Sequence, residues 1–198
     1  TVKLMENTYR DVNIAIANEF AQISERIGVN VMEAIQLANY HPRVDILIPG
    51  IGVGGHCISV DPWFLVDSAP ETATLTHTAR NVNDSQPKFF VNLVNQVLGD
   101  LNKLKISVLG LTYKADVDDM RGSPALHIIS ILREQGAIVK AYDPYNPKVN
   151  LPQVYVSPTI EKAIVDSDAI LVLVSHLKFK KLTPEYLSTI TKTRIIFD

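Results

Sequence analysis

Thiols are scarce in this sequence: Cys57 is the single cysteine among 198 residues. One cysteine excludes a disulfide within the chain, and a lone thiol is typical of a reducing compartment, so we expect a cytoplasmic protein. Long apolar runs are missing too, since none approaches the roughly 18 residues of a membrane-spanning helix, and no secretory signal opens the chain. We therefore expect no membrane partner.

An excess of charge is also absent, because 19 basic residues stand against 21 acidic ones for a net charge of -2. Basic residues neither cluster nor alternate with aromatic ones, which argues against a nucleic-acid partner. What remains, 46% hydrophobic and 20% charged residues, is the composition of an ordinary globular protein of one or two domains. The chain starts without Met and inside a helical pattern, so we expect a piece of something longer.

Helical periodicity dominates the first half of the sequence. Apolar residues at steps of four and three predict one amphipathic helix over residues 2–27, which ends at Gly28. Asn30 and Glu33 resemble a capping box that opens a second helix. The expected apolar face of the first helix consists of Val12, Ile16, Phe20, Ile23 and Ile27.

A third helical stretch covers residues 71–101, and we expect an interruption or kink near Pro87, because proline lacks the backbone donor. From residue 105 onward, short apolar strands alternate with helices. The expected strands are residues 105–111, 137–143, 169–174 and 194–197. The two helices between them are expected to open at Ser123 with Pro124 and at Ser157 with Pro158.

Apolar strands that alternate with helices are typical of a parallel sheet covered on both faces. The predicted fold class is therefore α/β: an all-helical central domain, which mediates dimerisation, followed by a Rossmann-like, doubly wound parallel-sheet domain. We place the central domain at residues 1–86, a connecting helix at 87–104 and the sheet domain at 105–198.

The loop "GLTYKADVDDMRGSP" follows the first strand, at the end of the sheet where such folds bind ligands. Gly110 is not part of a GxGxxG, so the loop is not a dinucleotide fingerprint. Lys114 and Arg121 are cations suited to a phosphate, although cations in a polar loop more often belong to a solvated surface. Asp143 ends the second strand, where these folds often hold a ribose hydroxyl.

The segment "PGIGVGGHCISVDPWF" places Cys57 directly after a run that contains four glycines. Backbone N–H groups of a glycine-rich turn can stabilise a thiolate and an oxyanion beside it. Asp61 is a candidate base toward water, and Lys3, Asn7 and Arg10 share one helical face. A small buried cysteine and a solvated helix face remain the alternative.

Three ordered motifs carry a resemblance to a known family. The segments "KLMENTYRDVNIAIANE", "PGIGVGGHCISVDPWF" and "GLTYKADVDDMRGSPA" resemble the nucleotide-sugar 6-dehydrogenases, also called the UDP-glucose/GDP-mannose dehydrogenase family. Members oxidise the C6 alcohol of UDP-glucose, GDP-mannose or UDP-N-acetylhexosamines to a carboxylate with NAD. His56 and the sequence "VDPWF" are most similar to members that act on UDP-N-acetyl-D-mannosamine; UDP-N-acetylglucosamine and UDP-glucose are the alternatives.

The resemblance also implies roles for matching positions. Cys57 would be the nucleophile that forms a thiohemiacetal and then a thioester, with Lys3 and Asn7 stabilising oxyanions and Asp61 assisting proton transfer. Arg121 would reach the NAD. The implied contacts to the UDP-sugar are Arg10, His41, Arg43, Gly54, Tyr113 and Lys114, of which His41 and Arg43 would serve a neighbouring subunit.

One departure from the family pattern limits the expected activity. The family carries an NAD-binding domain with a GxGxxG before the helix that opens this chain, and these 198 residues contain no such sequence. We therefore expect a homodimeric core and UDP-binding fragment that is inactive by itself. The alternative of another class is a nucleotide-binding and oligomerisation module without chemistry. A cysteine hydrolase is disfavoured, because neighbouring side chains such as His56 and Cys57 diverge on a tight turn.

Overall fold

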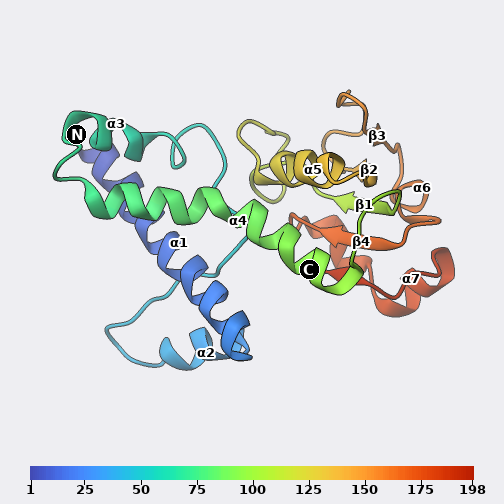
Figure 1. The fold of residues 1–198 in the computed structure, drawn as a ribbon, viewed down its shortest axis with the longest axis horizontal. Helices are drawn as coiled ribbons and strands as arrows, with labels where there is room; N and C mark the ends of the chain where they lie inside the picture. Colours follow the sequence, from blue (N-terminus) through green and yellow to red (C-terminus); the bar gives the residue numbers. More distant parts are fainter. The chain divides into compact units, whose positions relative to one another are not determined.

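The computed structural model describes residues 1–198, which form two compact units, Thr1–Phe89 and Phe90–Asp198 (Figure 1). The first unit is helical and the second is built on a parallel sheet, so the predicted fold class is confirmed. The finer division at residues 86 and 104 stays a prediction. No helix combines the length and the apolar character that a membrane crossing requires.

The helical unit contains α1 (Val2–Ile27), α2 (Val31–Ala38), α3 (Asp61–Ser68) and most of α4 (Thr74–Leu98). Gly28 ends α1 in the left-handed conformation, with φ of 70°, as its position predicted. The Asn30 side chain caps α2 by accepting the N–H groups of Met32 at 3.0 Å and Glu33 at 3.3 Å. The predictions for both helices are therefore confirmed.

Two features of this unit differ from the expectation. Helix α3 was not predicted; it begins at Asp61, with Pro62 in its first turn. Helix α4 continues through Pro87, so the expected interruption is absent, while the alternative of a kink stays a prediction. Pro87 is buried, and the helical segments on both sides of it pack in the interior, where Asn83, Gln86, Val91 and Val94 are buried. Packing of this kind holds the helix together across the missing backbone hydrogen bond.

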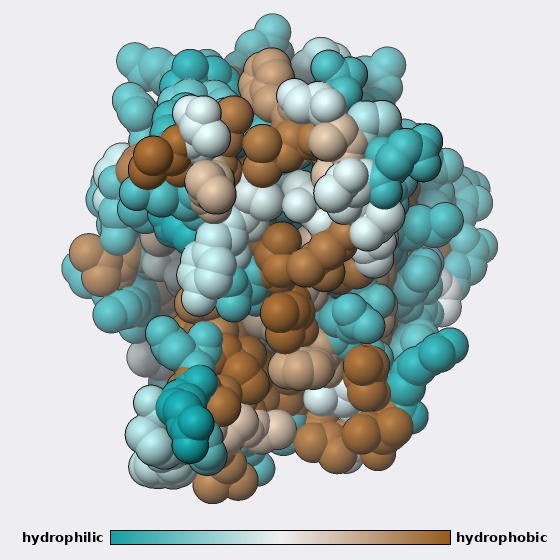
Figure 2. Space-filling model, turned by 90° about the vertical axis from the view of Figure 1, so that its left-hand side faces the viewer, coloured by the Kyte–Doolittle hydropathy of each residue, from teal (hydrophilic) through white to brown (hydrophobic).

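The side of α1 that is buried within this unit is not the predicted apolar face. Helix α1 buries Thr8, Asp11, Ala15, Ala17, Asn18 and Ser24. The apolar residues Ile16, Phe20, Ile23 and Ile27 stay 41–66% exposed. Figure 2 shows several groups of apolar side chains, in brown, on the surface that it presents. The apolar face of α1 is thus available at the surface of the unit.

A row of polar contacts, which we call the polar seam, joins α1 to α4 where the two helices cross in Figure 1. Four contacts make up the seam: Arg80 to Asp11 at 2.5 Å, Asn83 Nδ2 to Asp11 Oδ1 at 2.9 Å, Asn18 Nδ2 to Asn83 Oδ1 at 2.8 Å, and Gln22 Nε2 to Gln86 Oε1 at 2.8 Å. Asp11, Asn18, Arg80 and Asn83 are almost completely buried. Buried polar groups are tolerated only when they are paired, and this row pairs most of them.

The second unit contains a five-stranded sheet in which every neighbouring pair is parallel, in the order β3-β2-β1-β4-β5. The strands are β1 (Lys105–Leu109), β2 (Ile138–Tyr142), β3 (Tyr155–Val156), β4 (Ala169–Val172) and β5 (Ile196–Phe197). The helices are α5 (Pro124–Glu134), α6 (Ile160–Ile164), the 3-10 helix η1 (Leu177–Lys181) and α7 (Pro184–Ile190). The doubly wound parallel sheet was predicted, whereas β3, η1 and α7 were not.

The strand order reverses direction at β1, because the chain first moves from β1 to β2 and β3 and then crosses to β4 on the other side. Right-handed crossovers therefore place α5 and α6 on opposite faces. On the α6 face, Leu109 and Ile170 pack against Ala163, Phe179 and Leu187. The crevice between the ends of β1 and β4 is the switch point where such sheets bind ligands.

The start of α6 corrects the prediction of a cap at Ser157. The helix begins at Ile160, and Thr159 caps it by accepting the Lys162 N–H at 3.3 Å. Ser157 directly follows β3, and its N–H donates to the Ala141 carbonyl of β2 at 2.8 Å, so it is not free to cap the helix. Its hydroxyl is buried without a hydrogen-bond partner. The predicted cap at Ser123 is confirmed, since its side chain accepts the Ala125 N–H.

Candidate functional site

Four of the predicted site residues converge in the helical unit. Lys3 and Asn7 lie one turn apart at the start of α1, and α3 packs beside them (Figure 1). The Lys3 ammonium lies 3.6 Å from Cys57 Sγ and 3.1 Å from Asp61 Oδ2. Asn7 Nδ2 donates to the same Asp61 oxygen at 2.5 Å. A thiol, an ammonium, an amide and a carboxylate thus form one cluster.

The turn that carries Cys57 connects the glycine loop directly to α3. The Cys57 carbonyl accepts the N–H groups of Val60 at 3.0 Å and Asp61 at 2.7 Å. Gly52 and Gly55 have φ of 130° and 90°, which only glycine adopts readily, so the loop can fold back onto α1. This local geometry places the thiol and the carboxylate on the same side of the turn.

Asp61 is held in its charged form by its neighbours. The hydrogen bond from Asn7 is the main cause that lowers the pKa of Asp61; burial opposes it, and Lys3 lowers the pKa further. In turn, the hydrogen bond and charge of Asp61 raise the pKa of Lys3. The Asp61 contribution to stability is present above its unfolded pKa and is lost as the pH falls through the folded value. The Lys3 contribution is present below its unfolded pKa and is lost as the pH rises through the folded value.

A lowered pKa makes Asp61 a weak base at neutral pH. Its buried carboxylate is therefore better suited to orienting a water molecule and to neutralising the Lys3 charge than to holding a proton between steps. Lys3 is 65% exposed at its side chain, so its ammonium faces the open side of the cluster, where a substrate oxygen can reach it. The cluster can hold a nucleophile beside a cation that stabilises a developing oxyanion.

Buried side chains of the polar seam also fix the start of the glycine loop, a contact that was not predicted. Asn18 Oδ1 accepts the Gly50 N–H at 2.9 Å, and Gln86 Nε2 donates to the Gly50 carbonyl at 2.9 Å. Both backbone groups of Gly50 are thereby held by two different helices. Only the helical placement of Asn18, on the same side of α1 as Asp11, hinted at a buried polar position.

The other predicted contacts of this unit lie outside the cluster. Gly54 is half-buried in the cysteine loop, and Arg10 is exposed on α1. His41 and Arg43 are exposed just after α2, where His41 Nδ1 accepts the Arg43 N–H at 3.3 Å. Figure 1 places α2 at the end of α1 opposite to Lys3. Within one chain, therefore, the structure does not bring His41 and Arg43 to Cys57.

In the sheet unit, the predicted ligand residues lie in the loop that follows β1. Tyr113 is half-buried and Lys114 is exposed. Arg121 forms an ion pair with Asp119, with Arg121 Nη2 at 2.6 Å from Asp119 Oδ2. These side chains stand at the carboxyl end of the sheet, as predicted.

Two further residues at this edge have structural roles. Asp143 is fully buried, and its oxygens accept the N–H groups of Leu111 at 2.8 Å, Tyr145 at 2.8 Å and Asn146 at 2.9 Å. The expectation that Asp143 holds a ribose hydroxyl is therefore wrong. Gly110 has φ of 91°, and a Cβ added there would lie 2.6 Å from Val174 Cβ. Its missing side chain thus serves packing between the ends of β1 and β4.

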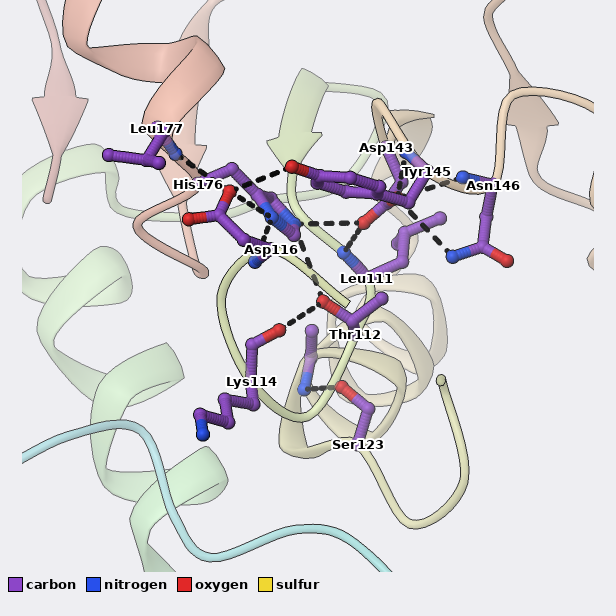
Figure 3. Close-up of polar contacts among 11 residues, drawn as sticks. Leu111, Thr112, Lys114, Asp116, Ser123, Asp143, Tyr145, Asn146, His176 and Leu177 are labelled. Carbon is purple, nitrogen blue, oxygen red and sulfur yellow. Dashed lines mark hydrogen bonds and ion pairs between the residues drawn. The ribbon is translucent and has the colours of Figure 1, made fainter. Parts of the chain in front are cut away.

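The ends of β1, β2 and β4 are tied together by polar contacts around His176, which sequence reasoning missed (Figure 3). His176 is buried and lies 3.2 Å from Asp143 Oδ2 through its Nε2. Asp116 accepts the Leu177 N–H at 3.0 Å and the Tyr145 hydroxyl at 3.0 Å. The one available signal was a histidine shortly after an apolar strand.

Comparison with known proteins finds close relatives along the whole chain. A UDP-N-acetyl-D-mannosamine dehydrogenase of Methanocaldococcus jannaschii is 48% identical over 100% of this chain and 45% of its own length. An NDP-N-acetyl-D-galactosaminuronic acid dehydrogenase of Ralstonia solanacearum is 46% identical over 99% of this chain and 46% of its own length. The chain therefore spans less than half of the length of these relatives.

Solved structures and family models agree with these relatives. A UDP-N-acetyl-D-mannosamine dehydrogenase from Pyrococcus horikoshii superimposes with a TM-score of 0.88 at 44% identity, over 98% of this chain and 46% of its own. The central-domain model of the UDP-glucose/GDP-mannose dehydrogenase family matches residues 1–85, and the UDP-binding-domain model matches residues 107–198. Since the two models together match most of its residues, the chain belongs to the UDP-glucose/GDP-mannose dehydrogenase family.

Proposed function

We propose that this chain supplies the catalytic cysteine and the UDP-sugar-binding domain of an NAD-dependent UDP-N-acetyl-D-mannosamine 6-dehydrogenase. The observation that supports it most is the convergence of Lys3, Asn7, Cys57 and Asp61, which the family motifs had singled out. The enzyme would convert the C6 alcohol of the sugar to a carboxylate, a loss of four electrons in two oxidations.

Cys57 acts after the first oxidation has produced a C6 aldehyde. Its thiolate attacks C6, a sulfur–carbon bond forms, and the carbonyl electrons move to oxygen to give a thiohemiacetal after protonation. The Lys3 ammonium, 3.6 Å from the sulfur, is placed to stabilise the oxyanion of this step. Oxidation of the thiohemiacetal gives a thioester that remains on Cys57.

Water then releases the product. It adds to the thioester carbonyl, the carbon–sulfur bond breaks, the Cys57 thiolate leaves, and the carboxylate departs with the sugar as the two protons of the water pass to solvent. We assign the orientation of this water to Asp61 and Asn7, which are bonded to each other and joined to the Cys57 sulfur through the Lys3 ammonium. The lowered pKa of Asp61 favours an orienting and electrostatic role in this step over long-lived proton storage.

When bound, NAD would accept the hydride in each oxidation. The residues of the sheet unit do not form a dinucleotide site of their own: Gly110 packs against Val174, and the Asp143 carboxylate is buried and bonded to the protein. Arg121 is the one position that we propose contributes to NAD binding. Its exposed guanidinium already pairs with Asp119, which would hold it in place.

The acetylated sugar is proposed on the strength of the relatives. Enzymes named for N-acetyl-D-mannosamine and for N-acetyl-D-galactosaminuronic acid are 48% and 46% identical to this chain. That difference is too small to separate the two sugars, so a UDP-N-acetylhexosamine is the firmer part of the proposal. A UDP-linked N-acetylhexosamine other than N-acetylmannosamine, such as N-acetylgalactosamine, is the second candidate.

The 198-residue chain should bind UDP but should not form NADH by itself. We expect measurable heat of binding when UDP is titrated into the purified chain, because Tyr113 and Lys114 lie on an ordered loop at the ligand-binding edge. With UDP-N-acetyl-D-mannosamine and NAD present, absorbance at the NADH band should stay at the level of a protein-free blank.

Steady NADH formation by the chain alone would contradict its proposed dependence on a further NAD-binding domain. A second assay decides between an enzyme and a binding module without chemistry. Adding the NAD-binding half of a relative, either fused or in trans, should restore NADH formation. A folded fusion that binds UDP and NAD but makes no NADH would favour the binding module.

We also propose that the chain self-associates through the helical unit. The exposed apolar residues of α1 continue into a groove between α1 and α2. The groove is lined by Phe20, Ile23, Ser24, Val31, Ala34, Ile35, Ala38 and Ile46. An apolar surface of this kind favours a homodimer over a monomer. We propose that His41 and Arg43 serve the cysteine site of that second copy, because they do not reach the cysteine site of their own chain.

Replacing Phe20 and Ile23 with glutamate should shift a dimer toward the monomer, because each charge would be buried against the partner. Sedimentation velocity at micromolar concentration measures the change. Glu19→Gln and Glu25→Gln, on exposed positions of the same helix, are the controls and should leave the dimer intact. A wild-type chain that sediments as a monomer would rule out this proposal.

A further inference from the structure

His176 bridges the switch point of the sheet. It follows β4, whereas Thr112 and Asp116 belong to the loop after β1, on the other side of the crevice. His176 Nε2 lies 3.3 Å from Thr112 Oγ1, and the Asp116 N–H donates to His176 Nδ1 at 2.9 Å. One imidazole therefore holds both ends of residues 112–116.

The bonding partners assign the proton on His176. Because Nδ1 accepts a backbone N–H, it carries no proton, and the neutral ring bears its hydrogen on Nε2. Nε2 then donates toward Asp143 at 3.2 Å and Thr112 at 3.3 Å. The Thr112 hydroxyl is left free to donate its own hydrogen to the Lys114 carbonyl at 2.8 Å. The hydrogen bonds from His176 to Thr112 and from Thr112 to the Lys114 carbonyl can therefore form at the same time.

The held segment has a conformation that needs support. Asp116 has φ of 59°, which is uncommon outside glycine. Three groups fix it: His176 at its N–H, and the Leu177 N–H and Tyr145 hydroxyl at its carboxylate. In Figure 3 the Lys114 side chain points away from His176, while its carbonyl faces Thr112.

We propose that His176 is a positioning residue for the UDP-sugar. By holding Thr112 and Asp116, it sets the backbone between them, which carries Tyr113 and Lys114, so that both side chains meet the diphosphate in one fixed arrangement. The identity of the ligand in this inference rests on the proposed function. That His176 holds residues 112–116 does not depend on it. A segment that is ordered before binding loses less conformational entropy when the ligand binds, so its affinity for the ligand is higher.

Two substitutions separate the two bonds of the ring. His176→Asn keeps an acceptor near the Nδ1 position and loses the Nε2 donor, whereas His176→Gln keeps a donor near Nε2 and loses the acceptor. Amide hydrogen exchange by NMR on the 198-residue chain is the first readout. Exchange of the Asp116 N–H should rise at least about tenfold in His176→Gln, the size expected for the loss of one buried hydrogen bond. It should change much less in His176→Asn.

UDP affinity is the second readout. His176→Phe, which loses both bonds, should weaken UDP binding by about tenfold or more, because the bound arrangement becomes a minor one. His127→Asn and His127→Gln, at an exposed histidine of α5 in the same unit, are the matched controls and should leave exchange and affinity unchanged. If His176→Phe fails to fold, Thr112→Val provides the same test, because it removes the hydroxyl that links His176 to Lys114.

The outcomes distinguish this inference from the proposed function. Folded His176 variants with wild-type loop exchange, or with looser loops but wild-type UDP affinity, would overturn the positioning role. A wild-type chain that does not bind UDP would overturn the proposed UDP site, while the exchange measurements would still decide whether His176 holds the segment. The nitrogen shifts of His176 give an independent check, because a proton on Nδ1 would contradict the assigned bonds.

Discussion

Replacing Cys57 with serine is expected to lower uronate formation by about three orders of magnitude or more, as for other enzymes that lose their nucleophile. The hydroxyl is a far weaker nucleophile than the thiolate, so the aldehyde would not be captured and no thioester would form. The measurement requires a complete dehydrogenase, in which these 198 residues follow the NAD-binding half of a relative. NADH formation and mass spectrometry of the sugar product report the two oxidations.

Three further measurements on the complete dehydrogenase serve as controls for Cys57→Ser. Because the chain has a single cysteine, alkylation with iodoacetamide within residues 1–198 reports Cys57 alone. Cys57→Ala should be as inactive as Cys57→Ser, and both should bind UDP as the wild type does. Ser68→Ala, on an exposed residue of α3, should leave activity unchanged. A Cys57→Ser enzyme that retains a tenth of wild-type uronate formation would exclude the covalent route.

Replacing Arg80 with methionine should destabilise the helical unit by about 3–5 kcal/mol, the usual effect of removing one partner of a buried ion pair. Arg80 is 1% exposed, and Asp11 is 0% exposed at 2.5 Å from it. Without the guanidinium, the Asp11 carboxylate stays buried without a counter-charge and keeps only the hydrogen bond from Asn83. Urea unfolding followed by circular dichroism measures the change in the free energy of unfolding.

The loss should depend on pH. Burial raises the pKa of Asp11, and Arg80 opposes this, so removing Arg80 should raise the pKa further. A carboxyl whose folded pKa lies above the unfolded one is least destabilising where it is protonated in both states. Its cost grows as the pH rises from the unfolded toward the folded value. The effect of Arg80→Met should therefore be smaller at acidic than at neutral pH.

Lys88→Met is the matched control, because Lys88 is an exposed cation on the same helix, and its replacement should change stability by less than about 0.5 kcal/mol. Combining Arg80→Met with Asp11→Leu should restore most of the lost stability, since an apolar pair often replaces a buried ion pair without loss. A double variant as unstable as Arg80→Met alone would show that the loss has another origin.

Local signals predicted much of the fold. Gly28 and Asn30 marked the boundary between α1 and α2, and Ser123 with Pro124 marked the start of α5, because caps are recognised within a few residues. The family motifs likewise grouped Lys3, Asn7, Cys57 and Asp61 before any distance was known. Ser157 misled for the same reason: it precedes a proline as Ser123 does, but the helix begins three residues later, at Ile160, with Thr159 as its cap.

Other features depend on partners that are distant in the sequence. The buried polar seam joins Asp11 and Asn18 to residues 65 to 72 positions further along. On a helical wheel these side chains form the polar side of α1, and no local pattern marks that side as the buried one. His176 is a similar case, because it meets Asp116 across 60 residues. Periodicity cannot report such pairs, since each residue alone is an ordinary polar one.

The polar seam has a consequence for the alignment of the whole helical unit. Apolar contacts between helices have no preferred direction, whereas hydrogen bonds hold only while their atoms stay in place. A slip of α1 by one turn, about 5.4 Å, would break every bond of the seam and would carry Lys3 and Asn7 away from Asp61. The seam thus fixes the position of α1 relative to α4 along the helix axis. It thereby also sets the distance between the Lys3 ammonium and the Cys57 sulfur, near the start of α1.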